Sequence, residues 1–367
     1  MNSLRSHHTF HIQCSSEKMK KRNLPYYFLY LGLLIITITS CRKTLSTGQP
    51  VDDKLVVLAE ITAGDSMKIP VGKTIKVGGG GIIRFEKVND ANVTIADLYS
   101  HHWVLQPSWS SQYASNPTTV YTNRLRFRSN YTYDLTITHP TLGTATATAV
   151  IPPLPVVTSF DTTAATYQGN DVLGVNICWK GSPDKNEYYI IEVLKQLVKV
   201  EHYFNYHGVH YNYDSPQGKA FYEQVKNNPA VVILVDTIPQ NDFLRINVFT
   251  DDNNSDNVAL DNLTQPFRRI FFKNNALNGP SYCTKIYVDR RFFIATDPSQ
   301  KGRIRIQFKS VQKELYNYLL AYEKYKTDFG ALPASQLTTP VGNIENGLGI
   351  FGGSARRERI YYFDSLW

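Results

Sequence analysis

The chain has 367 residues, with 39 Lys and Arg residues against 31 Asp and Glu residues. Five of the basic residues and one acidic residue lie in residues 1–40, so the remainder carries 34 − 30 = +4 rather than the +8 of the whole chain. These basic residues are scattered rather than banked in one run, which argues against a nucleic-acid-binding protein. A remainder of about 325 residues predicts two domains, and its abundance of Tyr, Thr, Val and Ile favours β-strands.

The N-terminal segment has the pattern of a secretory signal. A basic cluster over residues 18–22 is followed by an apolar run from Leu24 to Ile38, 15 residues long. A membrane-spanning helix needs roughly 18 or more residues, so this run is too short to be one. A positive patch, a short apolar run and small residues before a cut site define a signal peptide. We therefore predict a signal peptide over residues 19–40, with residues 1–18 upstream of the true start.

The signal ends in the sequence Ile38-Thr39-Ser40-Cys41, which is the lipobox pattern of bacterial lipoproteins. In that chemistry the thiol accepts a diacylglycerol, and the small residues before it fit the protease that frees the Cys41 amine. Several acyl chains on one residue hold a protein on a membrane effectively permanently. We predict a lipid anchor at Cys41 and a polar tether over residues 41–50; the alternatives are an uncleaved anchor helix and a cysteine placed by chance.

Two further cysteines, Cys178 and Cys283, remain after the anchor. An exported chain enters an oxidising compartment, where a disulfide is allowed. Such a bond would close a loop of roughly 100 residues and contribute roughly 4 to 5 kcal/mol in the chain-entropy model. The sequence leaves open whether the two thiols pair or never meet.

Residues 51–151 have the pattern of an immunoglobulin-like β-sandwich. Apolar and polar residues alternate over 131–138, and Thr alternates with Ala over 144–150. The turn residues 140–143 between these two segments predict a hairpin. Several short strands separated by turns at this spacing are typical of such sandwiches.

Three prolines in Ile151–Pro155 place a boundary, because proline cannot donate to a sheet ladder. A second sandwich-like domain is predicted over residues 156–367, opening with strands at 175–179 and 188–194. The predicted fold is therefore mainly β, with two sandwich-like domains, a short inserted helix and one C-terminal helix.

The inserted helix is predicted from Ser215, a cap, and Pro216, at the first helical position, to Asn227. The C-terminal helix is predicted over 311–326 with Ser310 as its cap. Its apolar residues recur at helical spacing and are interpreted as core against the second sheet: Leu315, Tyr318, Leu319, Tyr322 and Tyr325.

Three histidines, His202, His207 and His210, lie within nine residues. They are candidate zinc or copper ligands if the segment folds back on itself, and a metal-dependent hydrolase is then the implied activity. The alternative, which we favour, is an exposed hairpin whose tyrosines cover the sheet or stack on a glycan or peptide.

Two other patterns are interpreted as structural. The glycine run 78–81 is not followed by Lys and Ser or Thr, so it is not a phosphate-binding loop. Asp252, Asn254 and Asp256 begin like a calcium loop but lack its turn glycine and closing glutamate. We interpret that segment as a polar turn.

The C-terminal run Asn343–Gly353 (Asn-Ile-Glu-Asn-Gly-Leu-Gly-Ile-Phe-Gly-Gly) resembles the ending of a lipoprotein family of the Bacteroidota, domain of unknown function 4249. The segments 88–95, 133–137 and 150–155 follow in the order of that family. Physically, the run predicts a glycine-rich turn over 343–353 whose apolar residues fill a hydrophobic seam: Ile344, Leu348, Ile350 and Phe351. The alternative is a docking edge for a partner strand.

The resemblance implies an accessory lipoprotein encoded beside a TonB-dependent outer-membrane receptor, and the only site residue that carries over from the family is the anchor, Cys41. We expect no cofactor. We therefore expect a non-catalytic lipoprotein of the outer membrane that binds such a receptor, or a glycan or peptide. A structural or adhesin role is the alternative. The basic residues Arg42 and Lys43 differ from the acidic residues that follow the cysteine in surface-exposed members, so the face of the membrane stays open.

Overall fold

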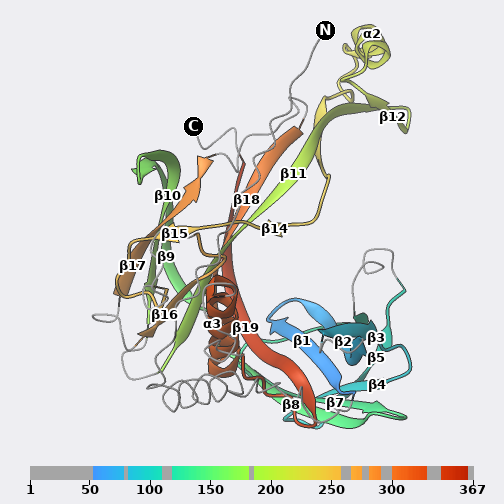
Figure 1. The fold of residues 1–367 in the computed structure, drawn as a ribbon. Coiled ribbons are helices and arrows are strands. Elements are labelled where there is room, and N and C mark those ends of the chain that lie inside the picture. Colours follow the sequence, from blue (N-terminus) through green and yellow to red (C-terminus); the bar gives the residue numbers. More distant parts are fainter. Residues whose placement is uncertain are drawn as a thin grey trace, which may run out of the picture. The chain divides into compact units, whose positions relative to one another are not determined.

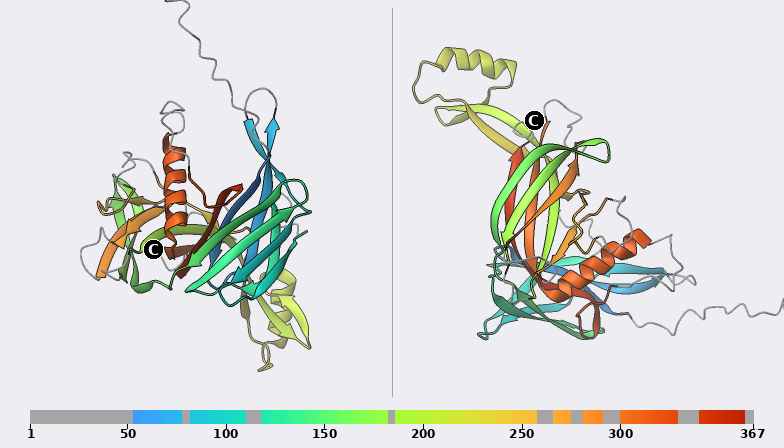
Figure 2. Two further views of the ribbon diagram at one scale, coloured as in Figure 1. Left: turned by 90° about the horizontal axis from the view of Figure 1, so that it is seen from below. Right: turned by 90° about the vertical axis from the view of Figure 1, so that its left-hand side faces the viewer.

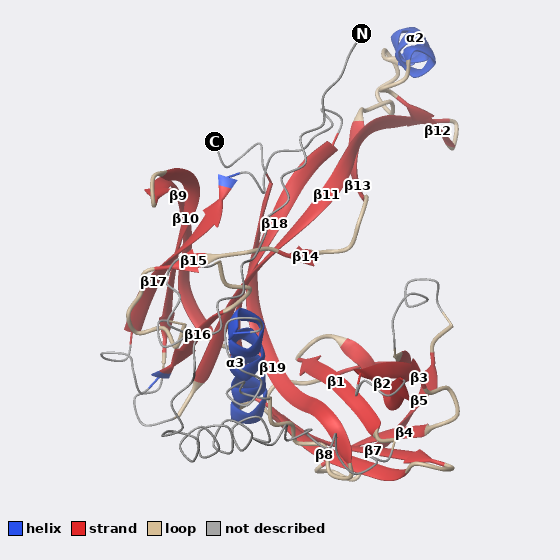
Figure 3. Ribbon diagram, in the orientation of Figure 1, coloured by secondary structure: helices blue, strands red, loops and turns tan. Residues whose placement is uncertain are grey.

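The computed structural model describes residues 53–77, 82–109, 118–181, 186–257, 266–274, 281–290, 300–328 and 340–362. The signal peptide, Cys41, the tether and the glycine run at 78–81 lie outside these residues. The described chain is mainly β, as predicted, and its two α-helices are α2 (Pro216–Val225) and α3 (Lys313–Asp328) (Figure 3).

The strands of the first half, up to the proline-rich segment, are short and follow one another closely: β1 (Leu55–Thr62), β2 (Ser66–Val77), β3 (Ile82–Lys87), β4 (Asn92–Asp97), β5 (His102–Pro107), β6 (Thr119–Arg126), β7 (Tyr131–His139) and β8 (Gly143–Ile151). The second half includes several longer strands: β9 (Val156–Tyr167), β10 (Asn170–Lys180), β11 (Tyr188–Tyr206), β12 (Val209–Asn212), β13 (Leu234–Pro239), β14 (Leu244–Arg245), β15 (Phe249–Thr250), β16 (Ile270–Lys273), β17 (Ser281–Asp289), β18 (Gln300–Val311) and β19 (Gly347–Tyr362).

One long sheet runs through both halves of the described chain. Its strands lie in the order β12-β11-β18-β19-β1-β2-β6-β5-β4-β7-β8, and β3, β13, β14 and β16 pair at its sides. The join is β19, which pairs antiparallel with β18 and parallel with β1, with Leu55 opposite Gly347 and Thr62 opposite Ser354. The first and last strands of the fold are therefore neighbours (Figure 1).

A second sheet, in the order β15-β17-β10-β9, packs on the β11-β18 part of the long sheet. Trp179 of β10 is fully buried between the sheets. Its ring centroid lies 4.6 Å from that of Phe308 and 5.5 Å from that of Phe272. This arrangement confirms the predicted sandwich-like stacking.

The first half folds its strands over a separate hydrophobic cluster. The hairpin predicted at 131–150 is present as β7 and β8, with Tyr131 opposite Ile151 and His139 opposite Gly143. The chain curls so that Thr146 of β8 pairs with Glu345, just before β19. Phe351 and Ala355 of β19 belong to this cluster. The predicted division at residues 151–156 stays a prediction, since β19 contributes to both halves.

Helix α2 begins where the sequence predicted it. The Ser215 side chain accepts a hydrogen bond of 2.9 Å from the backbone N–H of Gly218, and Pro216 stands at the first helical position. This cap satisfies one of the backbone donors that every helix start leaves free.

Helix α3 begins two residues later than the predicted 311, at Lys313, and its predicted cap is wrong. Ser310 lies in β18, where its hydroxyl donates to the carbonyl oxygen of Pro153. The strand continues to Val311 because Ser310 and Val311 still pair with Ala355 and Ser354 of β19. Leu315 is buried as predicted, whereas Tyr322 is 39% exposed.

The C-terminal glycine-rich run is mostly strand rather than the predicted turn. Gly349 has φ +104°, and a Cβ there would lie 1.9 Å from the carbonyl oxygen of Val57, so only glycine fits between the strands. The Asn343 side chain makes two hydrogen bonds with the backbone of Phe351: it accepts one from the Phe351 N–H and donates one to the Phe351 carbonyl oxygen. Phe351 is fully buried, but Leu348 is 40% exposed, so its predicted place in the seam is wrong.

Candidate functional site

One face of the long sheet packs on the two larger hydrophobic clusters, and the other, which we call the charged face, carries buried charges beside a third, smaller apolar cluster under α3. Residues alternate between the faces along each strand, and the face opposite the two hydrophobic clusters carries Glu60 of β1, Glu192 of β11 and Lys309 of β18. Lys309 Nζ lies 2.9 Å from Glu60 Oε1 and 2.8 Å from Glu192 Oε2. A single buried cation thus joins carboxylates from strands far apart in the sequence.

Arginines extend this network around Glu192. Arg269 Nε and Arg245 Nη2 lie 2.7 and 2.9 Å from Glu192 Oε1, and Arg269 Nη1 lies 3.0 Å from Glu323 Oε1 of α3. The helix is therefore fastened to the sheet by charge as well as by the packing of Leu315.

Burial alone would raise the pKa of the Glu192 carboxyl, but Lys309, Arg245 and Arg269 outweigh burial and hold that pKa well below its ordinary value. For Lys309, burial acts to lower the pKa, and the two glutamates raise it above the ordinary lysine value. Both groups are therefore charged at neutral pH and held by each other, an arrangement that stabilises one geometry rather than supplying a free acid or base.

A pocket of about 370 Å³ opens on the charged face beside Glu60. It is lined by polar and charged side chains over two buried apolar ones: Glu60, Ile61, Thr62, Asp65, Ser66, Lys68, Arg126 and Phe127. Arg356 of β19 borders it and holds Asp65 in a two-point contact, at 2.7 and 2.8 Å. Its volume lies near the lower limit of protein ligand pockets, whose linings are mostly apolar.

The histidine segment forms the predicted hairpin. β11 and β12 are joined by a tight turn in which His207 and Gly208 have φ +49° and +78°. His202 Nδ1 lies 3.0 Å from Asp214 Oδ1, and His210 stacks on Tyr203 with ring centroids 4.4 Å apart. The pairing of Asn205 with His210 puts His210 and His202 on opposite faces of the hairpin. The three histidines are therefore not brought together, and the described residues contain no group of three or more potential metal ligands.

The far end of β11, with β12, β13 and α2, forms an arm, which we call the ribbon (residues 199–239). Figures 1 and 2 show α2 at the far end of β11, away from α3. Phe204 is fully buried beneath Tyr211, Phe221 and Tyr222. Several aliphatic side chains of the ribbon face solvent: Val209, Val232, Leu234, Val235 and Ile238. Leu234 and Val235 are neighbours on β13, so the exposed aliphatic side chains lie on both faces of the ribbon.

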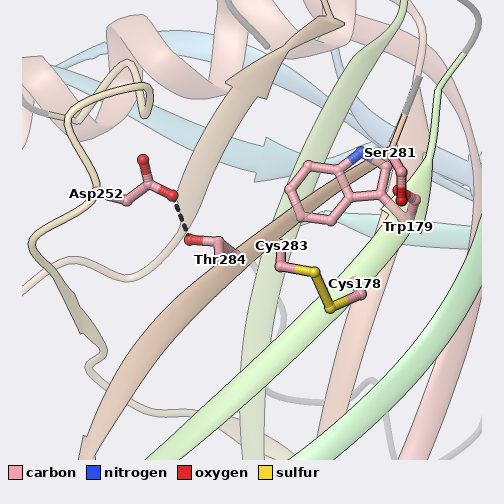
Figure 4. Close-up of a disulfide and its surroundings, with 6 residues drawn as sticks. All are labelled: Cys178, Trp179, Asp252, Ser281, Cys283 and Thr284. Atoms are coloured by element: carbon pink, nitrogen blue, oxygen red, sulfur yellow. Dashed lines mark hydrogen bonds between the residues drawn. A yellow bond between two sulfur atoms is a disulfide. The ribbon is translucent and has the colours of Figure 1, made fainter. Parts of the chain in front are cut away.

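Cys178 and Cys283 stand opposite each other on β10 and β17 and form a disulfide (Figure 4). The segment that resembles a calcium loop makes hydrogen bonds within the fold. Asp252 accepts from the Thr284 hydroxyl at 2.6 Å and from the Tyr282 hydroxyl at 2.7 Å. Burial and the Asp252 carboxylate raise the pKa of Tyr282 to about 12, so this phenol stays a hydrogen-bond donor.

Comparison with known protein families gives a match that covers most of the chain. The sequence model of a family described as "Domain of unknown function (DUF4249)" matches residues 44–360. The chain belongs to the DUF4249 family. The match spans both halves of the fold, from before β1 to within β19, which confirms the resemblance drawn from the C-terminal run. No curated protein gives a significant match. In the part of this DUF4249 chain that the structure describes, neither helix is long and apolar enough to cross a membrane.

Sequence reasoning missed the charged network of this DUF4249 protein. Its signal was present: Glu192 interrupts an apolar stretch of β11, and Lys309 occupies an alternating strand just before a helix. A lone charge in a strand predicts a partner on a neighbouring strand, but the sequence does not say which strand is the neighbour.

Proposed function

We propose that this DUF4249 chain is a lipid-anchored protein of the cell envelope that acts by binding, as an accessory to a TonB-dependent outer-membrane receptor. The main observation in favour of export from the cytoplasm is the Cys178–Cys283 disulfide. Such bonds are stable in oxidising compartments and rare in the cytosol. Together with the signal pattern ending at Cys41, this supports an anchored protein outside the cytoplasm.

Two features support binding as the activity. The buried charged groups of the long sheet are paired with one another, so they supply rigidity and not reactivity. The ribbon instead exposes Val232, Leu234 and Val235 at 58, 42 and 60%. Exposed apolar side chains on an arm of the fold suit contact with a larger partner, which we propose is the receptor.

The test is recovery of the tagged full chain from detergent-solubilised outer membranes, with Cys41→Ala as the control for anchoring. A β-barrel receptor recovered in near-equal amount supports the accessory role. Recovery of the chain alone, from membranes that hold it, favours the structural or adhesin role. A Cys41→Ala chain that stays in the membrane fraction contradicts the anchor.

A matched pair of variants locates the contact. Val235→Glu places a charge on the ribbon, and Phe85→Glu places one on β3, where Phe85 is 44% exposed. We expect the ribbon variant to lose the receptor and the β3 variant to retain it. Equal recovery by both variants contradicts a contact through the ribbon.

A further inference from the structure

The second half of β19 has an open edge. β18 pairs with β19 along Ser354–Tyr362, but β1 pairs with it only along Gly347–Ser354. The last contact on the β1 side is the hydrogen bond of 2.9 Å from the backbone N–H of Ala63 to the carbonyl oxygen of Ser354. Beyond it β1 turns away into β2, and no other described strand pairs with this side of β19.

The direction of the free backbone groups follows from that last contact. The Ser354 carbonyl points towards β1, and backbone groups alternate in direction along a strand. The N–H and C=O groups of Arg356, Glu358 and Ile360 therefore point to the open side, whereas those of Arg357 and Arg359 point to β18. Three successive donor–acceptor sets form the template that an added strand needs.

A groove lies beside this edge. It has a volume of about 430 Å³ and runs between β19 and β9, the edge strand of the second sheet. Its walls are residues 157–161 of β9 and residues 357–359 of β19. The Tyr361 hydroxyl donates to the carbonyl oxygen of Phe160 at 3.0 Å and holds the two strands at the end of the groove.

The charges around the groove are not balanced. Arg356 is paired with Asp65, and Glu358 is paired with Arg356 and Arg305. Arg357 and Arg359 are exposed, and no ion pair of the described residues includes either of them. They stand two residues apart, so both side chains lie on the same face of β19, where Arg359 also lies over the ring of Tyr361 at 5.9 Å. Two acidic residues line the groove, Asp161 and Glu358, and Glu358 is already paired with Arg305 and Arg356.

We infer that this groove takes an extended acidic segment of a partner protein, which adds as a strand to the open edge of β19. Its acidic side chains, two residues apart, pair with Arg357 and Arg359, and its backbone bonds to Arg356, Glu358 and Ile360. A second copy of the same edge is disfavoured because like charges would face each other. The inference rests on the proposed binding function. It adds a second contact to that function, in which an acidic strand of the partner binds the edge of β19.

The probe is a fluorescent seven-residue peptide, Thr-Val-Glu-Val-Glu-Val-Thr, titrated onto the full chain in detergent at low salt. A peptide with Lys in place of Glu is its partner. We expect the acidic peptide to bind about tenfold or more tightly than the basic one. Equal affinity for the two peptides overturns the charge assignment.

N-methylated peptides separate strand addition from simple charge attraction. Methylation removes a backbone donor without changing charge. Methyl groups on one alternate set of residues should abolish binding, and those on the other set should be tolerated. If methylation of the Val residues abolishes binding, the peptide adds as an antiparallel strand. If methylation of the Glu residues abolishes binding, it adds as a parallel strand. Two methylated peptides that both bind like the parent overturn strand addition.

The charge-reversal variant Arg357→Glu/Arg359→Glu should invert the preference to the Lys peptide, which a misfolded chain would not do. The control Arg124→Glu/Lys313→Glu makes the same change in net charge elsewhere on the surface and should keep the acidic preference. If both variants lose the acidic peptide equally, binding follows net charge and the groove assignment is wrong.

The receptor pull-down separates this inference from the proposed function. If Arg357→Glu/Arg359→Glu recovers the receptor fully and the acidic peptide never binds, the groove assignment fails while the accessory role stands. If wild type recovers no receptor but binds the acidic peptide in the methylation-dependent way, the groove stands and the accessory role fails.

Discussion

The two ends of β11 show how one strand serves two purposes. Its first part, Tyr188–Val198, has β18 along one edge and buries Ile191 and Val193 completely in the sandwich. Its last part, in the ribbon, pairs with β12 and β13 and is covered on one side by α2 and its aromatic side chains. The first part draws stability from burial between two sheets, whereas the ribbon holds a small local cluster and leaves several apolar side chains exposed to solvent.

The largest expected effect is loss of the disulfide from the sandwich. Cys178→Ala/Cys283→Ala frees a loop closed over 105 residues of sequence, which predicts a loss of about 5 kcal/mol in the free energy of unfolding. Urea unfolding followed by Trp fluorescence measures it. Reduced wild type should unfold at the midpoint of the variant, and a variant as stable as oxidised wild type would contradict the prediction.

A cavity in the sandwich core should lower the free energy of unfolding nearly as much as loss of the disulfide does. Trp179→Ala removes a fully buried ring and is expected to lower the free energy of unfolding by about 3 to 5 kcal/mol. Trp179→Phe keeps an aromatic ring and should lose less, because part of the contact with Phe308 remains. Thermal unfolding of both variants checks the order, and equal losses would show that ring volume does not matter there.

Breaking the charged network is expected to have an effect of similar size. Lys309→Met should lower the free energy of unfolding by about 3 to 5 kcal/mol, because Glu60 and Glu192 lose the cation that they share. The penalty should depend on pH. The folded pKa of Glu192 is held below its unfolded value of about 4.3, so its stabilisation is complete above the unfolded pKa and is lost as pH falls through the folded pKa.

The gap in stability between wild type and Lys309→Met should therefore narrow as pH falls below about 4. Urea midpoints of both proteins at pH 7 and at pH 3.5 provide the measurement. A gap that widens in acid would mean that Glu192 does not depend on Lys309. The double variant Lys309→Met/Glu60→Gln should recover part of the loss, because one unpaired carboxylate is removed.

The smallest global effect is expected in the ribbon. Phe204→Ala and Phe272→Ala each remove a fully buried ring, one from the ribbon and one from the sandwich. We expect the ribbon variant to change global stability by less than about 0.5 kcal/mol and to lose amide protection only within residues 199–239. The Phe272 variant should lose about 3 to 5 kcal/mol. If both variants lost the same free energy of unfolding, the ribbon and the sandwich would unfold as one cooperative unit, contrary to the prediction.

What the sequence could predict was mostly local. The alternation over 131–150 is sufficient for the β7–β8 hairpin, and Ser215-Pro216 for the start of α2. Tyr316, fully buried against Phe271, was missed because the predicted stripe included its neighbour Leu315 but ran on through Tyr318 and Tyr322. The partners of Glu192 and of Cys178 could not be assigned, because each depends on which distant strands become neighbours.

The parallel contact between β1 and β19 has a consequence for how the protein is made. Leu55 and Gly347 are paired across nearly the whole chain, and contacts of such long separation form slowly. A chain that emerges from its N-terminus delivers β1 early and β19 last. Until the final residues arrive, one edge of β1 is unpaired, so the newly made protein passes through an interval in which a chaperone can bind that edge.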